Sequence, residues 1–505
     1  MPVRKHKNKI GELLSPWLDG ITLPDEIAAL SVSGLTLDSR QIKGGEMFVA
    51  VKGHTVDGRR FISTALAAGV AFVLADSDDD TCYLATEAEM EGKVLFLPDL
   101  SSQLSAIAKR FYGAPDEALE LVAVTGTNGK TTISQLLAQW TQLLGDRAGV
   151  MGTTGNGLLG NIQPAANTTG SALEIPQVLD AMVEQGANYA ALEVSSHGLV
   201  QGRVKALQFR ASIFTNLSRD HLDYHGDMAS YADAKKTLFT QHHCGSAIIN
   251  ADDPVGREWL ATLPDAVAVA QDKSHVVAHA GQKLWLESVD YSTEGVTVCF
   301  DSSWGHGQFS APLVGAFNVM NLLLSLATLL VTGRSLNQLL AVAPSLKAVT
   351  GRMEVFQQPD KAMMVVDYAH TPDALEKALQ ALRVHCRTKL WCIFGCGGDR
   401  DRGKRPMMAR IAEQLADRVI LTDDNPRSEN PANIMSDIQA GLINLDNTMV
   451  IHDRFKACEW ALTQAEADDI ILVAGKGHED YQILADQTIH YSDRETVQAL
   501  LERHA

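Results

Sequence analysis

The 505-residue chain lacks the features that mark several large classes of protein. It has only 7 cysteines, an odd number, and no Cys-x-x-Cys pair, so neither a disulfide framework nor a cysteine-based zinc site is predicted. Basic residues are in deficit, with 43 Lys and Arg against 61 Asp and Glu and a formal charge of -18. This balance disfavours nonspecific binding to nucleic acid or to acidic membranes. We expect a protein of the reducing cytoplasm that meets anionic ligands with local basic residues.

Long apolar runs are absent as well. The run at 322–331 is too short to span a bilayer and follows Asn318 and Asn321, so a buried helix is expected there. Arg4, Lys5 and Lys7 are not followed by an apolar segment of signal-peptide length. We therefore expect no membrane association.

The length predicts about three domains, and the fold class predicted from the patterning is α/β. Residues 1–100 form a small α/β domain, with strands expected at 35–40, 46–51, 70–75 and 94–97 and a helix at 60–68. Residues 101–347 form a central domain, with strands at 121–125, 188–194, 211–216 and 246–250 and a helix at 172–185. Residues 348–505 form a C-terminal domain, with strands at 363–367, 390–394, 419–422 and 470–474 and helices at 372–382 and 407–415. Alternating strands and helices favour parallel sheets covered on both faces.

The sequence G-T-N-G-K-T at 126–131 follows a predicted strand and precedes a predicted helix. Gly126 and Gly129 let the backbone approach an anion, Lys130 adds a positive charge, and Thr131 offers a hydroxyl to magnesium. The stretch departs from the full G-x-x-x-x-G-K-[ST] pattern, because Val124 stands where the first glycine belongs. An ordinary strand-to-helix turn is the alternative.

Four polar clusters follow strands of the central domain, at 167–170, 193–198, 219–225 and 234–236. Ligands of open α/β sheets gather at the carboxyl ends of the strands. A phosphate loop needs a nearby carboxylate to hold magnesium, so Glu193 with Thr131 is the first predicted metal pair. Imidazole is uncommon on magnesium, and for His221 a hydrogen-bonded loop histidine is therefore the simpler interpretation.

Five motifs together resemble the Mur ligases: G-T-N-G-K-T at 126–131, E-V-S-S-H-G-L at 193–199, T-N-L-S-R-D-H-L-D-Y-H at 215–225, G-A-F-N-V-M-N at 315–321 and D-Y-A-H-T-P-D at 367–373. The resemblance runs through essentially the whole chain. It implies a UDP-binding N-terminal domain, a central P-loop ATPase domain and a Rossmann-like C-terminal domain. It also implies an ATP- and Mg2+-dependent ligase that joins meso-2,6-diaminopimelate to UDP-N-acetylmuramoyl-L-alanyl-D-glutamate during peptidoglycan precursor synthesis, and we expect a monomer.

The resemblance assigns residues to each ligand. ATP would be bound by Gly126, Thr127, Asn128, Gly129, Lys130, Thr131, Thr132, Asn318, Arg352 and Asp367. The UDP-linked substrate would be bound by Leu37, Ser39, His54, Thr55, Val56, Asn167, Thr168, Thr169, Ser195, Gln201 and Arg203. The catalytic residues would be Lys130, Glu193, His221 and Lys235.

Lys235 matches the lysine that this family carbamylates to N6-carboxylysine. The carbamate is an oxygen ligand, and the resemblance implies that it shares a second magnesium with His221. The metal ligands would then be Thr131, Glu193, His221 and the Lys235 carbamate. An ordinary surface lysine is the alternative, and Lys236 leaves one ambiguity of register.

By resemblance, diaminopimelate would be bound by Arg400, Asp424, Asn425, Pro426, Arg427, Gly475 and Glu479. It differs from lysine by a distal carboxylate, which Arg427 and Arg400 can bind in two-pronged fashion. A plain Asx-Pro turn is the alternative for 423–427. The G-C-G-G-D-R turn at 395–400 lacks the spacing of a dinucleotide loop.

Three other functions stay open. Folylpolyglutamate synthases share the ATP module, but the N-terminal domain and residues 424–427 argue against them. A lysine-adding ligase of the same family is a closer alternative. A catalytically inactive nucleotide-binding scaffold is disfavoured by the joint presence of Lys130, Thr131, Glu193, His221 and Lys235.

Overall fold

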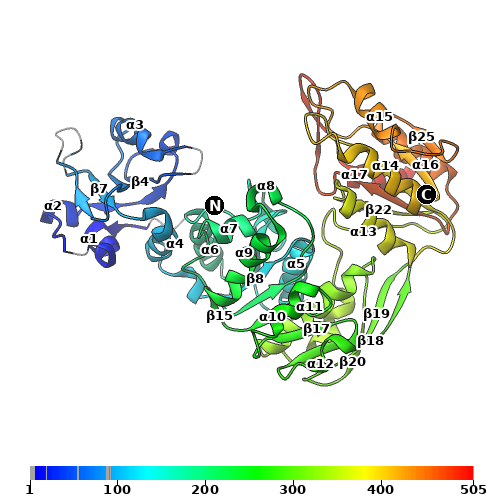
Figure 1. Cartoon of the computed structure of the whole chain (residues 1–505), viewed down its shortest axis with the longest axis horizontal. Helices are drawn as coiled ribbons and strands as arrows, with labels where there is room; N and C mark the ends of the chain where they lie inside the picture. Colours follow the sequence, from blue (N-terminus) through cyan, green and yellow to red (C-terminus); the bar gives the residue numbers. More distant parts are fainter. Residues whose placement is uncertain (1–5, 19, 54–55, 87–89, 91, 504–505) are drawn as a thin grey trace. The chain divides into compact units, whose positions relative to one another are not determined.

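The structure is a computed structural model of the whole chain and describes residues 6–18, 20–53, 56–86, 90 and 92–503. The chain divides into two compact units, residues 1–268 with 279–281, and residues 269–278 with 282–505 (Figure 1). The predicted domain boundaries at 100/101 and 347/348 stay predictions.

The N-terminal part of the first unit is built on a five-stranded sheet in the order β3-β4-β5-β7-β6. Its strands are β3 (Gly34–Thr36), β4 (Glu46–Ala50), β5 (Phe72–Asp76), β6 (Tyr83–Leu84) and β7 (Val94–Leu97), and only β6 pairs antiparallel. Side chains alternate along each strand, so Met47 and Val49 pack in one core with α4 (Leu100–Phe111), while Phe48 and Ala50 pack in another with α3 (Ile62–Ala67). Both faces of this sheet are therefore buried, as the α/β prediction requires.

The larger sheet of the first unit has the order β11-β10-β9-β12-β8-β14-β16. The parallel strands are β8 (Glu120–Thr125), β9 (Ala148–Gly152), β12 (Tyr189–Glu193), β14 (Ala211–Phe214) and β16 (Ala247–Asn250). β10 (Gly155–Leu158) and β11 (Asn161–Gln163) add an antiparallel edge. Helices of this region are α5 (Lys130–Leu143), α6 (Glu174–Glu184), α7 (Ser196–Val200), α8 (Leu222–His225), α9 (Met228–Thr240) and α10 (Pro254–Leu260). The carboxyl ends of β8, β12 and β14 lie side by side, which places the loops after residues 125, 193 and 214 together.

The second unit begins with antiparallel strands and a buried helix. β18 (Lys283–Ser292), β19 (Gly295–Ser302) and β20 (Gly307–Ala311) pair in sequence order. Helix α11 (Phe317–Val331) is buried from Asn318 to Leu330, which confirms the buried helix expected at 322–331. Among the described residues, no helix is long and apolar enough to cross a membrane.

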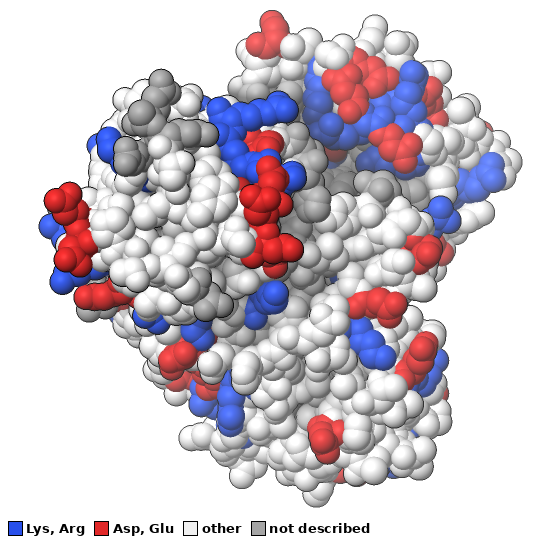
Figure 2. All heavy atoms as spheres, turned by 60° about the vertical axis from the view of Figure 1, so that its left-hand side comes forward, with Lys and Arg blue, Asp and Glu red and all other residues white. Residues whose placement is uncertain are grey.

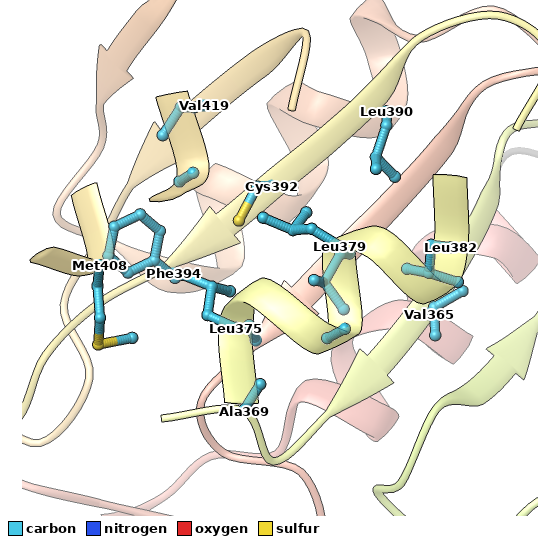
Figure 3. Packing of buried hydrophobic residues seen from close by; sticks show 14 of the residues in the cluster. Val365, Ala369, Leu375, Leu379, Leu382, Leu390, Cys392, Phe394, Met408 and Val419 are labelled. Carbon is cyan, nitrogen blue, oxygen red and sulfur yellow. The ribbon is translucent and has the colours of Figure 1, made fainter. Parts of the chain in front are cut away.

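The rest of the second unit is a six-stranded sheet in the order β21-β22-β26-β23-β24-β25. Its strands are β21 (Glu354–Phe356), β22 (Met363–Asp367), β23 (Leu390–Phe394), β24 (Arg418–Leu421), β25 (Thr448–Val450) and β26 (Ile470–Ala474), parallel except for β21. Its helices are α13 (Pro372–Arg383), α14 (Lys404–Leu415), α15 (Pro431–Gln439), α16 (Arg454–Gln464) and α17 (Asp493–Arg503), and the hairpin of β27 (Tyr481–Ile483) and β28 (Thr488–His490) precedes α17. Figure 3 shows Leu375, Leu379 and Leu382, spaced at i, i+4 and i+7 on α13, packed against the strands.

The parallel strands confirm the predicted fold class. The antiparallel strands β10 and β11, and the antiparallel strands β18 to β20, were not predicted. In β18 and β19, buried residues such as Leu284, Val296 and Val298 alternate with exposed or half-buried ones. Such strands carry no continuous apolar run, which is the pattern that predicted the parallel strands.

Candidate active site

The phosphate loop connects β8 to α5, as predicted. Gly126 has φ 144° and Gly129 has φ 87°, both in the region that favours glycine. A Cβ on Gly126 would lie 1.9 Å from Thr215 Oγ1, so the loop also requires glycine there for space. Lys130 Nζ donates to the carbonyl oxygens of Gly126 (3.0 Å) and Thr127 (2.9 Å), which holds the ammonium over the loop at the start of α5.

The residues that directly follow β14 fix the other side of this loop. The Asn216 carbonyl oxygen accepts from Thr127 N–H and the Asn216 side-chain oxygen accepts from Asn128 N–H, both at 2.9 Å. Thr215 donates its hydroxyl to the Asn128 carbonyl at 2.6 Å. These two residues were predicted only as the end of a strand, and their role in shaping the loop appears only once β14 lies beside β8.

The structure brings together the predicted magnesium pair. Thr131 Oγ1 donates to Glu193 Oε2 at 3.0 Å, and both side chains are buried. Thr153 holds the same carboxylate through its N–H to Oε1 (2.9 Å) and its hydroxyl to Oε2 (3.2 Å). A hydroxyl and a carboxylate at the end of a phosphate loop fit magnesium, a hard cation that takes oxygen ligands. No sequence signal marked Thr153.

Lys235 lies buried beside the loop, on α9. Its Nζ donates to the Gly126 carbonyl at 2.9 Å and lies 4.5 Å from the centroid of the Tyr231 ring. Burial, and next the nearby Lys130 charge, hold the pKa of Lys235 well below its usual value. Because Lys235 is buried, it is not the surface lysine of the alternative interpretation. Lys236 is the half-buried neighbour, which favours Lys235 in the ambiguous register.

His221 also lies near Tyr231, with a ring-to-ring distance of 6.2 Å. It has φ 52° just before α8, its side chain is 47% exposed, and its Nε2 lies 3.4 Å from Asp220 Oδ2. His221 and Lys235 therefore both lie near the Tyr231 ring. In the described part of the chain, no three His, Cys, Asp or Glu side chains form a ready metal site.

The residues expected to bind the peptide part of the substrate form one hydrogen-bonded network. Thr169 donates its hydroxyl to the Glu193 carbonyl (2.9 Å) and to Ser195 Oγ (3.1 Å). Arg203 donates to the Thr169 carbonyl at 2.6 Å and, through Nε at 2.9 Å, to Gln201 Oε1. Burial lowers the pKa of Arg203 without removing its charge. These side chains thus adjoin Glu193.

Two more of these residues precede that network in the chain. The Thr168 hydroxyl lies 3.0 Å from that of Thr153, which already holds Glu193. Asn167 is exposed. The network therefore extends from Arg203 to the magnesium pair through Thr153.

The predicted UDP residues follow neighbouring parallel strands of the N-terminal sheet. Leu37 and Ser39 come after β3, and Val56 after β4, so all three lie toward one edge. His54 and Thr55 lie outside the described residues.

A pocket of about 510 Å³ in the first unit is lined by Lys52, Gly53, Ser101, Gln201, Lys205 and His242, among others. Figure 2 shows Lys and Arg side chains interspersed with Asp and Glu on one face of the molecule.

In the second unit, the predicted nucleotide residues lie near the ends of β22 and α11. Asp367 Oδ1 accepts from Met353 N–H at 2.8 Å, and the Arg352 guanidinium lies 4.6 Å from the centroid of the Tyr368 ring. Burial raises the pKa of Asp367, and the Arg352 charge opposes that shift. Asn318 is buried at the start of α11, where its side-chain amide donates to the Val314 carbonyl at 2.6 Å.

The two predicted specificity arginines lie on adjoining loops after β23 and β24. Arg427, at φ 53°, donates to the carbonyl oxygens of Gly398 (3.0 Å) and Asn425 (3.4 Å), and Arg400 donates to the Asp399 carbonyl (3.2 Å). A Cβ on Gly398 would lie 1.9 Å from the Pro426 carbonyl oxygen, so the loops touch closely there. The stretch at 423–427 is thus part of a built contact rather than an isolated turn.

A buried arginine connects these two loops through hydrogen bonds. Arg405 on α14 is fully buried and donates to Glu429 at 2.6 and 2.8 Å, to Asp437 at 2.8 Å and to the Gly397 carbonyl at 3.1 Å. Its hydrogen bonds lower the pKa of Glu429 to about 2. Arg405 was not predicted, because the sequence alone does not distinguish a buried arginine that holds two loops from an exposed one.

The remaining predicted pocket residues meet at the ends of β24 and β26. Asn425 donates its side-chain amide to Glu479 Oε2 at 3.3 Å, and Tyr368 donates its hydroxyl to Glu479 Oε1 at 3.4 Å. Asp424 Oδ2 would be 3.8 Å from a Cβ on Gly475, which has φ 122°. Lys476 and Tyr368 were not predicted, although each is next in sequence to a predicted residue, Gly475 and Asp367 respectively.

Comparisons with known proteins cover nearly the whole chain. Family models match in three places: the Mur ligase family catalytic domain at 31–112, the Mur ligase middle domain at 124–329 and the Mur ligase glutamate ligase domain at 351–477. The UDP-N-acetylmuramoyl-L-alanyl-D-glutamate--2,6-diaminopimelate ligase of Vibrio cholerae serotype O1 is 58% identical over 493 residues, covering 98% of each chain. The ligase of the same name from Vibrio vulnificus (strain YJ016) is 58% identical over 489 residues, 97% of each chain.

Solved structures agree with these relatives. A structure of a ligase with the same name superposes with a TM-score of 0.73 at 36% identity and covers 99% of both chains. A MurF structure from Acinetobacter baumannii reaches a TM-score of 0.65 at 17% identity, covering 99% of this chain and all of that one, which shows a shared fold alone. The near-complete coverage at 58% identity settles the family. The chain belongs to the Mur ligase family.

Proposed function

We propose that the chain is the ATP-dependent ligase that adds meso-2,6-diaminopimelate to the D-glutamate γ-carboxylate of UDP-N-acetylmuramoyl-L-alanyl-D-glutamate. The observation that carries the proposal is a pair of sites in one chain. One is a phosphate loop whose Thr131 contacts Glu193. The other is a pair of adjoining loops that carry Arg400 and Arg427, followed by a cluster in which Lys476 lies beside Asp424 and Glu479. The relatives with this name, at 58% identity, support the same substrates.

The first step is transfer of a phosphoryl group. A γ-carboxylate oxygen of the substrate attacks the γ-phosphorus of ATP, and the bond from that phosphorus to the β-γ bridging oxygen breaks. ADP leaves, and the substrate carboxylate becomes an acyl phosphate. Lys130, already held over the loop by two carbonyl oxygens, stabilises the charge on the phosphoryl oxygens. Asn318, Arg352 and Asp367 are proposed to hold the rest of the nucleotide.

The second step forms the amide. The neutral amine of diaminopimelate attacks the acyl carbon, a tetrahedral intermediate collapses, phosphate leaves and the amine loses a proton. No side chain of the protein forms a covalent bond, so the enzyme acts by positioning and by charge stabilisation. Thr169, Ser195, Gln201 and Arg203 are proposed to orient the dipeptide next to Glu193.

Magnesium is proposed at Thr131 and Glu193, with a second ion between His221 and carbamylated Lys235. Bound magnesium would neutralise phosphate charge. The lowered pKa of buried Lys235 raises the fraction of uncharged amine that can add to CO2, and the resulting carbamate would supply oxygen ligands beside the loop. Leu37, Ser39, His54, Thr55 and Val56 are proposed to bind the UDP moiety.

Lysine lacks the distal carboxylate. With lysine bound, Arg400 and Arg427 would have no substrate carboxylate to bind. This favours diaminopimelate over the lysine-adding alternative. We also propose that the enzyme works as a monomer in the cytoplasm.

Release of phosphate from ATP tests the activity. We expect release only when ATP, the UDP-linked dipeptide and diaminopimelate are all present, and none when any one is omitted. Release with a folate substrate would favour the folylpolyglutamate alternative. No release with the complete mixture would favour an inactive scaffold.

A further inference from the structure

Lys476 is a fully buried lysine that the proposed reaction has not used. It follows β26, between Gly475 and Gly477, and its side chain has 0% exposure. Burying an ammonium is costly unless partners compensate it. The identity of those partners therefore indicates what the residue does.

All the partners of Lys476 belong to the proposed amino-acid pocket or adjoin it. Its Nζ donates to the Tyr481 carbonyl (2.7 Å) and to Asn425 Oδ1 (3.1 Å), and lies 3.3 Å from Asp424 Oδ1 and 3.6 Å from Glu479 Oε2. Asp424 and Asn425 follow β24, Glu479 follows β26, and Tyr481 begins β27. One ammonium thus ties together three separate segments.

The amide of Asn425 reinforces the same arrangement. Its oxygen accepts from Lys476 and from Ile483 N–H (3.0 Å), while its nitrogen donates to Glu479 Oε2 (3.3 Å). Asn425 is therefore oriented by Lys476 on one side and orients Glu479 on the other. Loss of the ammonium would release both carboxylates and the amide between them.

The charges around Lys476 also favour a cationic ligand. Asp424 and Glu479 bring two negative charges to one positive charge, so the cluster has a surplus of one negative charge. One ammonium group of a diamino acid matches that surplus. Two carboxylates without Lys476 would repel each other, and the repulsion would move them out of position.

We propose that Lys476 is a positioning residue that holds Asp424 and Glu479 together to receive an ammonium group of the incoming diamino acid. The inference rests on the proposed function, because it takes this pocket to bind diaminopimelate. It adds a residue that sets the affinity for the diamino acid without contacting the reacting atoms.

The test is Lys476→Met, which keeps much of the side-chain volume and removes the charge. We expect the KM for diaminopimelate to rise at least about tenfold, as for removal of one partner of a buried charge pair, while the KM values for ATP and the UDP-linked dipeptide stay within about twofold. The matched control is Lys361→Met, since Lys361 is a half-buried lysine of the same unit that donates to the Leu501 carbonyl at 3.1 Å. The control should leave all three KM values unchanged.

A second variant separates charge from folding. In Lys476→Ala, n-propylammonium added during purification and assay should lower the KM for diaminopimelate, and n-propanol should not. An unchanged KM for diaminopimelate in Lys476→Met, a parallel rise of all three KM values, or equal rescue by the alcohol would overturn the inference. Wild-type enzyme that does not use diaminopimelate would instead reject the proposed function.

Discussion

At the scale of single residues, Arg427 has the most direct effect on the proposed choice of substrate. Its guanidinium is held by two backbone carbonyl oxygens and remains able to bind a carboxylate. We expect Arg427→Ala to lower kcat/KM for diaminopimelate by about 100-fold, since loss of one partner of a charged pair costs roughly 2–5 kcal/mol. Steady-state kinetics with diaminopimelate and with lysine measure the effect.

The control for Arg427→Ala is Arg383→Ala. Arg383 is a half-buried arginine of the same unit that contacts the Leu415 carbonyl and Asp417. It should leave kcat/KM unchanged. A loss for lysine as large as that for diaminopimelate in Arg427→Ala would argue against recognition of the distal carboxylate.

Lys235 is proposed to act as a carbamate, an oxygen ligand, instead of as the cation that a lysine ordinarily provides. Lys235→Ala should lose activity by roughly 10- to 100-fold, the usual effect of losing a group that supports a metal site. Short carboxylic acids should restore part of it by supplying the missing oxygen ligands. Activity of Lys235→Ala equal to that of wild type, without added acid, would rule out the carbamate.

The ion pair of Glu429 with Arg405 makes the stability of the folded protein depend on pH. Its pKa falls from 4.5 to about 2 in the folded protein because Arg405 donates to it. A lowered folded-state pKa adds stability above pH 4.5 that is lost as the pH falls toward 2. The difference in Tm between wild type and Glu429→Gln should therefore be largest near neutral pH and shrink on acidification. A difference that stays constant from about pH 7 to about pH 3 would contradict this assignment.

At the scale of elements, the phosphate loop depends on one glycine. Gly126→Ala would place a Cβ 1.9 Å from Thr215 Oγ1 at a φ of 144°, so the loop must move away from β14. We expect the KM for ATP to rise at least about tenfold, because loop N–H groups and Lys130 lose their positions.

Gly145→Ala separates backbone strain from crowding. Gly145 has φ 103°, but nothing lies within 4 Å of its added Cβ. It should cost about 1 kcal/mol of stability and leave the KM for ATP unchanged. Equal effects of the two variants on that KM would show that the Thr215 contact is irrelevant.

The elements also show where sequence patterns succeed. Strands β8, β12, β22 and β26 are fully or almost fully buried, so each appears as a short apolar run that predicts it. Strand β18 has one buried residue, Leu284, and is otherwise half-buried or exposed, so it gave no such run. Local patterns therefore predict the parallel cores and miss the strands with one solvated face.

At the scale of the whole molecule, the candidate sites were predicted in part. Thr131 and Glu193 are 62 residues apart in sequence, and only the phosphate-loop logic paired them before the fold was known. Lys476 and Thr153 contact predicted residues, and Arg405 contacts the Gly397 carbonyl in the turn that leads to Arg400. None of the three belongs to a motif quoted from the sequence. Their roles depend on which loops adjoin, which sequence spacing does not determine.

The central claim is the identity of the amino acid that the enzyme joins. Purified enzyme would be incubated with ATP, the UDP-linked dipeptide and equal concentrations of diaminopimelate and lysine, and the nucleotide products identified by mass. We expect the diaminopimelate adduct to dominate by about 100-fold or more, because only that substrate pairs with Arg400 and Arg427. A lysine adduct in equal or greater amount would contradict the account.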